Sequence, residues 1–241
     1  MMNQTDNCSL CQQERELANS HIIPEFLFEL LYDKKHRMHL FKAGQPREHK
    51  LIQKGLRSPM LCKGRSSCEE RISKWEQYAS QVFFYEPVKG SDYNDALVFK
   101  GVDYAQFKLF QMSILWRASV SSLTAFNAVS LGPHQERLRK MIYKGDPGEP
   151  HEFGCAMSIR RKSLKGMEEL IVSPSVSRVE GHGMFTFIIN GIIWQFFVSS
   201  HTSKLPIAGY FLTRDGELPF VLMPEDTYDN LILRATKELL H

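Results

Sequence analysis

The sequence predicts an α+β fold, in which a small zinc-bound module precedes a helical layer packed on an antiparallel sheet. Three observations predict it. Four of the five cysteines fall in the first third of the chain and form two pairs. Between residues 103 and 143, apolar side chains recur at helical spacing. From residue 152 onward the pattern changes to short apolar runs typical of strands.

The composition is that of an ordinary globular protein, with 43% hydrophobic and 24% charged residues in a chain of 241. A net charge of +3 neither requires nor excludes a nucleic-acid partner. No apolar run approaches the roughly 20 residues of a transmembrane helix, and the polar first residues do not resemble a signal peptide. We therefore expect a cytoplasmic protein without membrane contact, and the sequence leaves its oligomeric state open.

The cysteine pairs predict a metal site. Cys8 and Cys11 are separated by two residues, and Cys62 and Cys68 form the second pair. In a reducing compartment such pairs are metal ligands more often than disulfides, and four thiolates are a usual ligand set for structural zinc. Disulfide or redox use of a pair is one alternative. A site in which His21 replaces one of the cysteines is another.

Two helices are expected in the predicted first domain, residues 1–88. Apolar residues recur at helical spacing in 25–33 and again in 68–86. A basic sector of this domain is either a solvated face or a nucleic-acid contact. The residues of this basic sector are Lys34, Lys35, His36, Arg37, His39, Arg47, Lys50, Lys54, Arg57, Lys63 and Arg65.

The predicted second domain, residues 96–241, follows a turn-rich segment at 89–95. Helices are expected first, with Asp103 as an N-cap, and strands after them, with Asn190-Gly191 as the tight turn of a hairpin. Cys155 lies in an apolar run and is expected to be a buried thiol. The expected helices are 103–121, 123–129, 133–143 and 226–240, and the expected strands are 153–160, 169–172, 184–189, 192–198 and 220–223.

The order Cys-x2-Cys, then Ser-His-Ile-Ile-Pro at 20–24, then Leu-Cys and Cys-Glu at 61–69 resembles the HNH endonuclease family with its zinc-bound ββα-metal fold. The resemblance implies that the four cysteines are structural zinc ligands. It implies that His21 is the general base that activates water against a phosphodiester. It also implies a second cation, Mg²⁺ or Mn²⁺, near the start of this segment and near Glu69 on the last helix.

Two hypotheses from different classes follow. In the first, the chain is a zinc-stabilised HNH-like endonuclease with His21 and Glu69 as catalytic residues, serving bacterial defence by analogy with such architectures. In the second, a catalytically degenerate zinc scaffold binds nucleic acid or a partner protein. Ser20 stands where an acidic or histidine ligand is expected, which favours the second. The ordinary alternatives are a packed histidine at 21 and a first-turn helix acid at 69.

Overall fold

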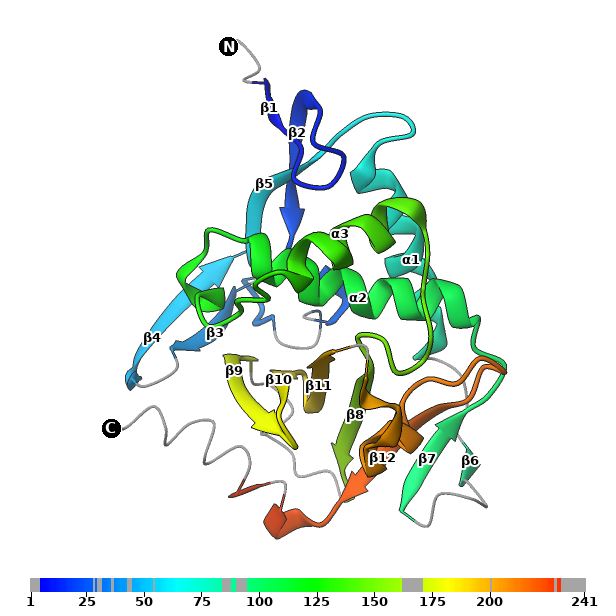
Figure 1. The fold of residues 1–241 in the computed structure, drawn as a ribbon. Helices are drawn as coiled ribbons and strands as arrows, with labels where there is room; N and C mark the ends of the chain where they lie inside the picture. Colours follow the sequence, from blue (N-terminus) through cyan, green and yellow to red (C-terminus); the bar gives the residue numbers. More distant parts are fainter. Residues whose placement is uncertain are drawn as a thin grey trace.

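The computed structural model describes residues 5–27, 29, 32–35, 37–42, 45–53, 55–83, 88–89, 95–161, 171–199, 201–227 and 229–230. These form three layers: a three-stranded sheet, a layer of helices and a nine-stranded sheet (Figure 1). The strands are β1 (Thr5–Asn7), β2 (Glu14–His21), β3 (Arg37–Lys42), β4 (Gln45–Gln53), β5 (Arg57–Cys62), β6 (Val88–Lys89), β7 (Ala96–Phe99), β8 (Cys155–Arg160), β9 (Ile171–Val179), β10 (His182–Ile189), β11 (Ile192–Val198) and β12 (Leu218–Met223). The helices are α1 (Cys68–Val82), α2 (Tyr104–Val120) and α3 (His134–Lys144), with 3-10 turns at Glu25–Leu27, Thr124–Phe126, Thr202–Lys204 and Pro206–Tyr210. The α+β class is therefore confirmed.

The small sheet has the antiparallel order β1-β2-β5 and leads directly into α1. Ser67 caps α1, since its hydroxyl oxygen accepts a hydrogen bond from the Glu70 N–H at 3.1 Å. One face of α1 is buried, and Ile72 and Trp75 lie on it at helical spacing. The expected helix from residue 68 is confirmed as far as Val82, and residues 84–87 lie outside the described part of the chain.

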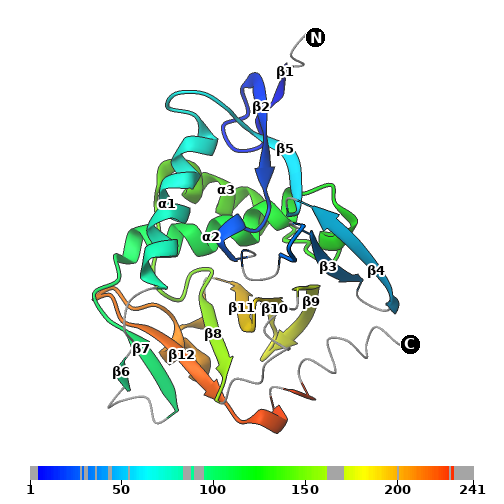
Figure 2. The same cartoon turned by 180° about the vertical axis from the view of Figure 1, so that it is seen from behind.

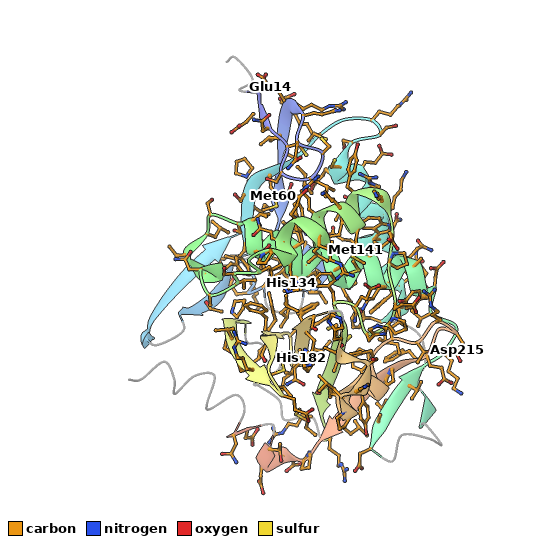
Figure 3. The ribbon with its side chains drawn as sticks, in the orientation of Figure 1. Glu14, Met60, His134, Met141, His182 and Asp215 are labelled. Carbon is orange, nitrogen blue, oxygen red and sulfur yellow. The ribbon has the colours of Figure 1, made fainter. Side chains whose placement is uncertain are left out.

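Helix α2 is buried on all sides along most of its length. Such a helix must be packed on more than one face, and α2 contacts both α1 and α3 above the large sheet (Figure 2). Asp103 caps it, as expected, by accepting the Gln106 N–H at 3.0 Å. Side chains fill the space between the helices and the large sheet (Figure 3).

Helix α3 begins directly after Pro133 and ends at Gly145, whose φ of 71° is the left-handed conformation common at helix C-termini. It confirms the expected helix over 133–143 to within one residue. The expected helix over 123–129 is only a 3-10 turn at Thr124–Phe126, which follows the extended residue Leu123. Such turns are usually short.

The large sheet has the order β4-β3-β9-β10-β11-β8-β12-β7-β6. The predicted hairpin is confirmed as β10 and β11, with Asn190 and Gly191 both at positive φ in its turn. Two pairs are parallel, β3 with β9 and β8 with β12, so the sheet is mixed rather than purely antiparallel. Cys155 on β8 is buried, as expected, and burial raises the pKa of its thiol.

The segment after β2 differs from the expectation. Within the expected helix 25–33, Glu25–Leu27 and Glu29 have 3-10 conformation, Tyr32 and Asp33 are not helical, and residues 28, 30 and 31 lie outside the described part. The basic segment that follows forms the hairpin β3–β4, and β3 pairs with β9. The N-terminal segment is thereby joined to the large sheet.

One cluster of buried side chains extends from Cys8 to Phe220. Residues 90–94 of the predicted domain boundary lie outside the described part of the chain, so the division into two domains stays a prediction. Of the expected helix over 226–240, the described residues 226, 227, 229 and 230 are helical, and the others lie outside the described part. Within the described residues, no helix combines the length and apolar character needed to cross a membrane.

Candidate metal centre

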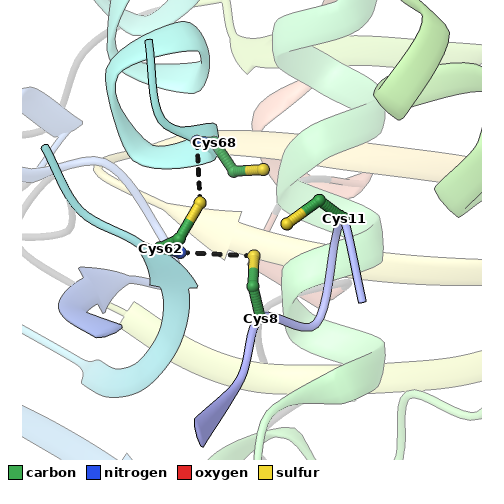
Figure 4. Close-up of side chains that lie close together, drawn as sticks. All are labelled: Cys8, Cys11, Cys62 and Cys68. Atoms are coloured by element: carbon green, nitrogen blue, oxygen red, sulfur yellow. Dashed lines mark hydrogen bonds between the residues drawn. The ribbon is translucent and has the colours of Figure 1, made fainter. Parts of the chain in front are cut away.

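The structure brings the four cysteines of the two pairs together (Figure 4). Cys8 and Cys11 lie on the turn between β1 and β2, Cys62 ends β5, and Cys68 begins α1. Their four sulfur atoms all lie within 4.8 Å of one another. Sulfur ligands at the usual zinc distance, arranged as a tetrahedron, would stand ~3.8 Å apart. The cluster is therefore compatible with one structural metal ion.

Backbone amides hold two of these sulfur atoms. The Cys62 N–H donates to Cys8 Sγ at 3.2 Å, and the Cys68 N–H donates to Cys62 Sγ at 3.3 Å (Figure 4). The turn is closed by Gln12, whose N–H donates to the Cys8 carbonyl at 2.8 Å while its φ is 60°. A non-glycine residue in this left-handed region is uncommon. The turn is thus shaped to present both of its sulfur atoms to the same point.

The ionisation of the thiols also favours metal binding. The pKa of Cys8 is lowered to about 4, chiefly by a hydrogen bond from the Cys68 thiol and further by backbone amides, although burial opposes this. The pKa of Cys68 is raised because its proton is shared with the Cys8 sulfur and because it is buried. Thiolates are the form that binds metal, so the lowered pKa of Cys8 favours metal binding.

Two arginines lie beside the cluster. Arg71 Nη2 is 4.0 Å from Cys68 Sγ, and its Nη1 donates to the Tyr143 carbonyl at 2.8 Å. Arg139 of α3 donates to the Leu10 carbonyl in the cysteine turn. Their positive charge offsets part of the negative charge of four thiolates around a metal. Arg71 stands one helical turn from Cys68, a spacing that the sequence contains, whereas nothing local marks Arg139.

A cavity of about 370 Å³ opens beside the cluster. Arg15 and Lys74 on its wall are exposed, and Lys74 Nζ lies 3.4 Å from Glu70 Oε1. The wall of the cavity is therefore mainly polar and basic. Its lining residues are Cys11, Gln13, Arg15, Cys62, Ser66, Ser67, Cys68, Glu70, Arg71, Lys74 and Tyr143.

His21, the expected general base, ends β2 and has a side chain that is 17% exposed. Its Nε2 lies 3.6 Å from Glu25 Oε2, and the same carboxylate oxygen accepts a hydrogen bond from Arg57 Nη2 at 3.2 Å. The His21 carbonyl accepts a hydrogen bond from Arg117 Nη1 at 2.6 Å. The residue is thus held through its ring and through its backbone.

Glu69, the second expected catalytic residue, lies against Ser20. The Ser20 hydroxyl donates to Glu69 Oε2 at 2.6 Å. Burial raises the pKa of the Glu69 carboxyl, and the Ser20 hydrogen bond opposes this rise only in part. Nearby, Arg117 is 2% exposed and lies 2.6 Å from Glu76 Oε1. We refer to Ser20, His21, Glu69, Glu76 and Arg117 as the polar network.

Within the described residues, the four cysteines are the group of histidine, cysteine and carboxylate side chains that could share one ion. Ser20 and Glu69 together offer a hydroxyl and a single carboxylate. No protein-family model, curated protein or solved structure matches the chain. The resemblance to HNH endonucleases therefore rests on the residues of this chain alone.

Proposed function

We propose that Cys8, Cys11, Cys62 and Cys68 hold one zinc ion. Four sulfur ligands are the donor set of structural zinc sites, which leave no coordination position for water or substrate. Such an ion would tie the cysteine turn to the end of β5 and the start of α1. We further propose that β2, β5 and α1 form an HNH-like ββα module around it.

The second cation of an HNH-like nuclease would lie near positions 20 and 69. These two side chains are adjacent, which supports the resemblance, but they are already bonded to each other at 2.6 Å. Mg²⁺ takes about six oxygen ligands in a strict geometry, and Arg117 already places a cation near Glu69. The residues therefore fit a catalytic cation poorly, and we derive no step through one.

We infer instead that this module is a catalytically degenerate scaffold that binds nucleic acid. The polar network supports the loss of catalytic capacity, and exposed cations near the cysteine cluster support the nucleic-acid partner. The Arg117 guanidinium is shared between Glu76 and the His21 carbonyl, and the Ser20 hydroxyl is directed at Glu69. The ion pair between Arg117 and Glu76 and the hydrogen bond between Ser20 and Glu69 engage these groups within the protein, which leaves them less capacity for a metal or a reacting phosphate.

Exposed cations near the cysteine cluster provide the proposed phosphate contacts. Arg15, Arg65 and Lys74 are exposed on strand β2, on the loop before α1 and on α1. Their charge is opposed by Glu70 and by the negative charge of a zinc tetrathiolate. Binding through a few such contacts is weak and depends strongly on salt concentration.

A second candidate, the metal-dependent nuclease, is favoured by one observation. His21 directly follows Ser20, and its ring lies beside the Glu25 carboxylate, which would orient it. An imidazole titrates close to neutral pH and suits a general base. This candidate requires that a divalent cation bind Glu69 in place of the hydrogen bond from the Ser20 hydroxyl.

One experiment separates the two candidates. The purified protein, its His21→Ala variant and an Arg15→Gln/Arg65→Gln double variant are incubated with plasmid and with single-stranded oligonucleotides, each with Mg²⁺ or Mn²⁺. The scaffold proposal expects no cleavage, salt-sensitive binding, and a salt dependence reduced by about two phosphate contacts in the double variant. Cleavage that is lost in His21→Ala would establish the nuclease instead, and absence of binding at low salt would refute the nucleic-acid partner.

A further inference from the structure

A second cavity of about 370 Å³ lies between the start of α3 and the strands β9, β10 and β11, outside the cysteine cluster and the polar network. His134 contributes to it from α3, Arg178 from β9 and His182 from β10, and Ser199 follows β11. Figure 3 shows His134 on the helical layer and His182 on the sheet below it. We refer to this cavity as the two-histidine pocket.

Both histidines are held in place by neighbours. His182 Nδ1 lies 3.0 Å from Ser199 Oγ, and this hydroxyl also accepts the His201 N–H at 3.0 Å. The His134 ring packs edge-on against Phe153, with 6.1 Å between the ring centroids. A ligand would therefore meet side chains that are already ordered, which lowers the entropic cost of binding.

The charge of the two-histidine pocket favours an anion. Arg178 donates to the Gly181 carbonyl at 3.2 Å, which leaves its other guanidinium donors for a ligand at the pocket. The lining residues include Arg178, both histidines and three serines, but no aspartate or glutamate. Guanidinium, imidazole and hydroxyl groups around an uncharged wall are the donors that bind phosphate oxygens.

The volume and the apolar wall indicate a ligand larger than phosphate. Pockets for small organic ligands begin at roughly 300 Å³, and this one has about 370 Å³. Leu131 and Phe185 line it, and Val176 is 58% exposed, an unusual exposure for a branched apolar side chain on a strand. An aromatic or apolar group joined to the phosphate would cover this surface.

We propose that the two-histidine pocket binds a phosphomonoester that carries a ring, such as a nucleoside monophosphate. The phosphate contacts Arg178 and His182, and the ring lies against Val176. The proposal concerns binding without any covalent step. It is carried by residues outside the zinc module and does not rest on the function proposed above.

The test uses the full chain and calorimetric titration with phenyl phosphate and adenosine monophosphate. Phenol, adenosine and inorganic phosphate are the comparison ligands. We expect at least one of the two esters to bind saturably at millimolar concentration or below. We expect its parts to bind about tenfold more weakly or worse, since a charged hydrogen bond or the apolar contact is lost with each.

Two variants and one control substitution test whether the ester binds in this pocket. Arg178→Gln is expected to weaken it about tenfold, whereas Lys204→Gln, an exposed lysine outside the pocket, removes the same charge and leaves binding unchanged. Gly183→Leu is expected to fill the pocket, because a Cβ at Gly183 meets no atom within 4 Å. Its unfolding temperature should match that of the parent chain. Failure of both esters to bind, equal affinity for an ester and its phosphate-free part, or unaltered binding in both Arg178→Gln and Gly183→Leu would overturn the proposal.

Discussion

Removal of one cysteine of the cluster gives a direct test of metal binding, because the chain contains its own matched control. Cys62 and Cys155 are each 1% exposed, and both end or begin strands of the fold. The substitutions Cys62→Ala and Cys155→Ala remove the same atoms from equally buried positions. Only Cys62 has its sulfur within reach of three others.

The expected magnitudes differ clearly. Cys155→Ala loses one packed sulfur atom, which costs about 1 kcal/mol of unfolding free energy. Structural zinc contributes about 10–16 kcal/mol in apparent binding free energy, so one of four equivalent ligands accounts for roughly 2.5–4 kcal/mol, or about a 10²–10³-fold loss of zinc affinity. Cys62→Ala also removes the acceptor of the Cys68 N–H bond.

The assay combines the zinc content of each purified protein with its urea unfolding curve. We expect about one zinc per chain for the parent and for Cys155→Ala, and much less for Cys62→Ala after dialysis against a weak chelator. The unfolding midpoint of Cys62→Ala should fall well below that of Cys155→Ala. Equal zinc content and equal midpoints in the two variants would refute the reasoning.

Three further predictions concern the fold around the site. Arg117→Met leaves the Glu76 carboxylate without its cation and should lower the unfolding free energy by about 3 kcal/mol, the low end for a buried pair because Glu76 is 19% exposed. Adding Glu76→Gln should recover part of this loss in urea unfolding. Equal losses in the single and double variants would contradict the pairing. Burial lowers the pKa of Lys108 to about 8, so on raising the pH the folded chain releases this proton before the unfolded chain does. The unfolding free energy of the parent relative to that of Lys108→Met should therefore rise by roughly 3 kcal/mol from pH 7.5 to pH 10.5. A difference in unfolding free energy that does not change with pH would contradict the burial of a charged lysine. Gly181 and Gly216 share a φ of +84°, but an added Cβ meets no atom within 4 Å at Gly181 and a backbone carbonyl oxygen at 2.4 Å at Gly216. Gly181→Ala should therefore lower the unfolding free energy by about 1 kcal/mol, and Gly216→Ala by at least about 2 kcal/mol more. Equal unfolding midpoints of the two variants would show that the backbone at Gly216 relaxes.

The elements that could be predicted from the sequence are those with local signals. Ser67 and Asp103 are helix-capping residues that directly precede segments with apolar residues at helical spacing. Asn190-Gly191 is a dipeptide typical of the tight turn of a β-hairpin. Helices α1 and α2 and the β10–β11 hairpin are local in this sense, so each expectation was confirmed to within a few residues.

The hairpin β3–β4 could not be predicted in the same way. Its strands mix basic and apolar residues, and its place in the large sheet depends on a parallel pairing between Leu40 and Ile171. Pairings between distant residues leave no periodic pattern in either segment. The helix over 25–33 is predicted from apolar spacing and from Pro24 at its start, without a capping signal at its end.

The convergence of the cysteines was predictable from residue type, although the five residues between Cys62 and Cys68 depart from the usual spacing. The structure accommodates them in a turn in which Gly64 and Ser66 both have positive φ. The polar network was predictable only in part. A buried Arg117 requires an acidic partner, but that this partner is Glu76 on another helix depends on how α1 and α2 pack.

The central claim is that one zinc ion joins the cysteine turn, the end of β5 and the start of α1. X-ray absorption at the zinc edge, on protein purified without added metal, tests it most directly. The account predicts one zinc per chain with four sulfur neighbours at about 2.3 Å and no nitrogen or oxygen ligand. Protein that folds fully without zinc, or a zinc spectrum dominated by nitrogen and oxygen ligands, would contradict it.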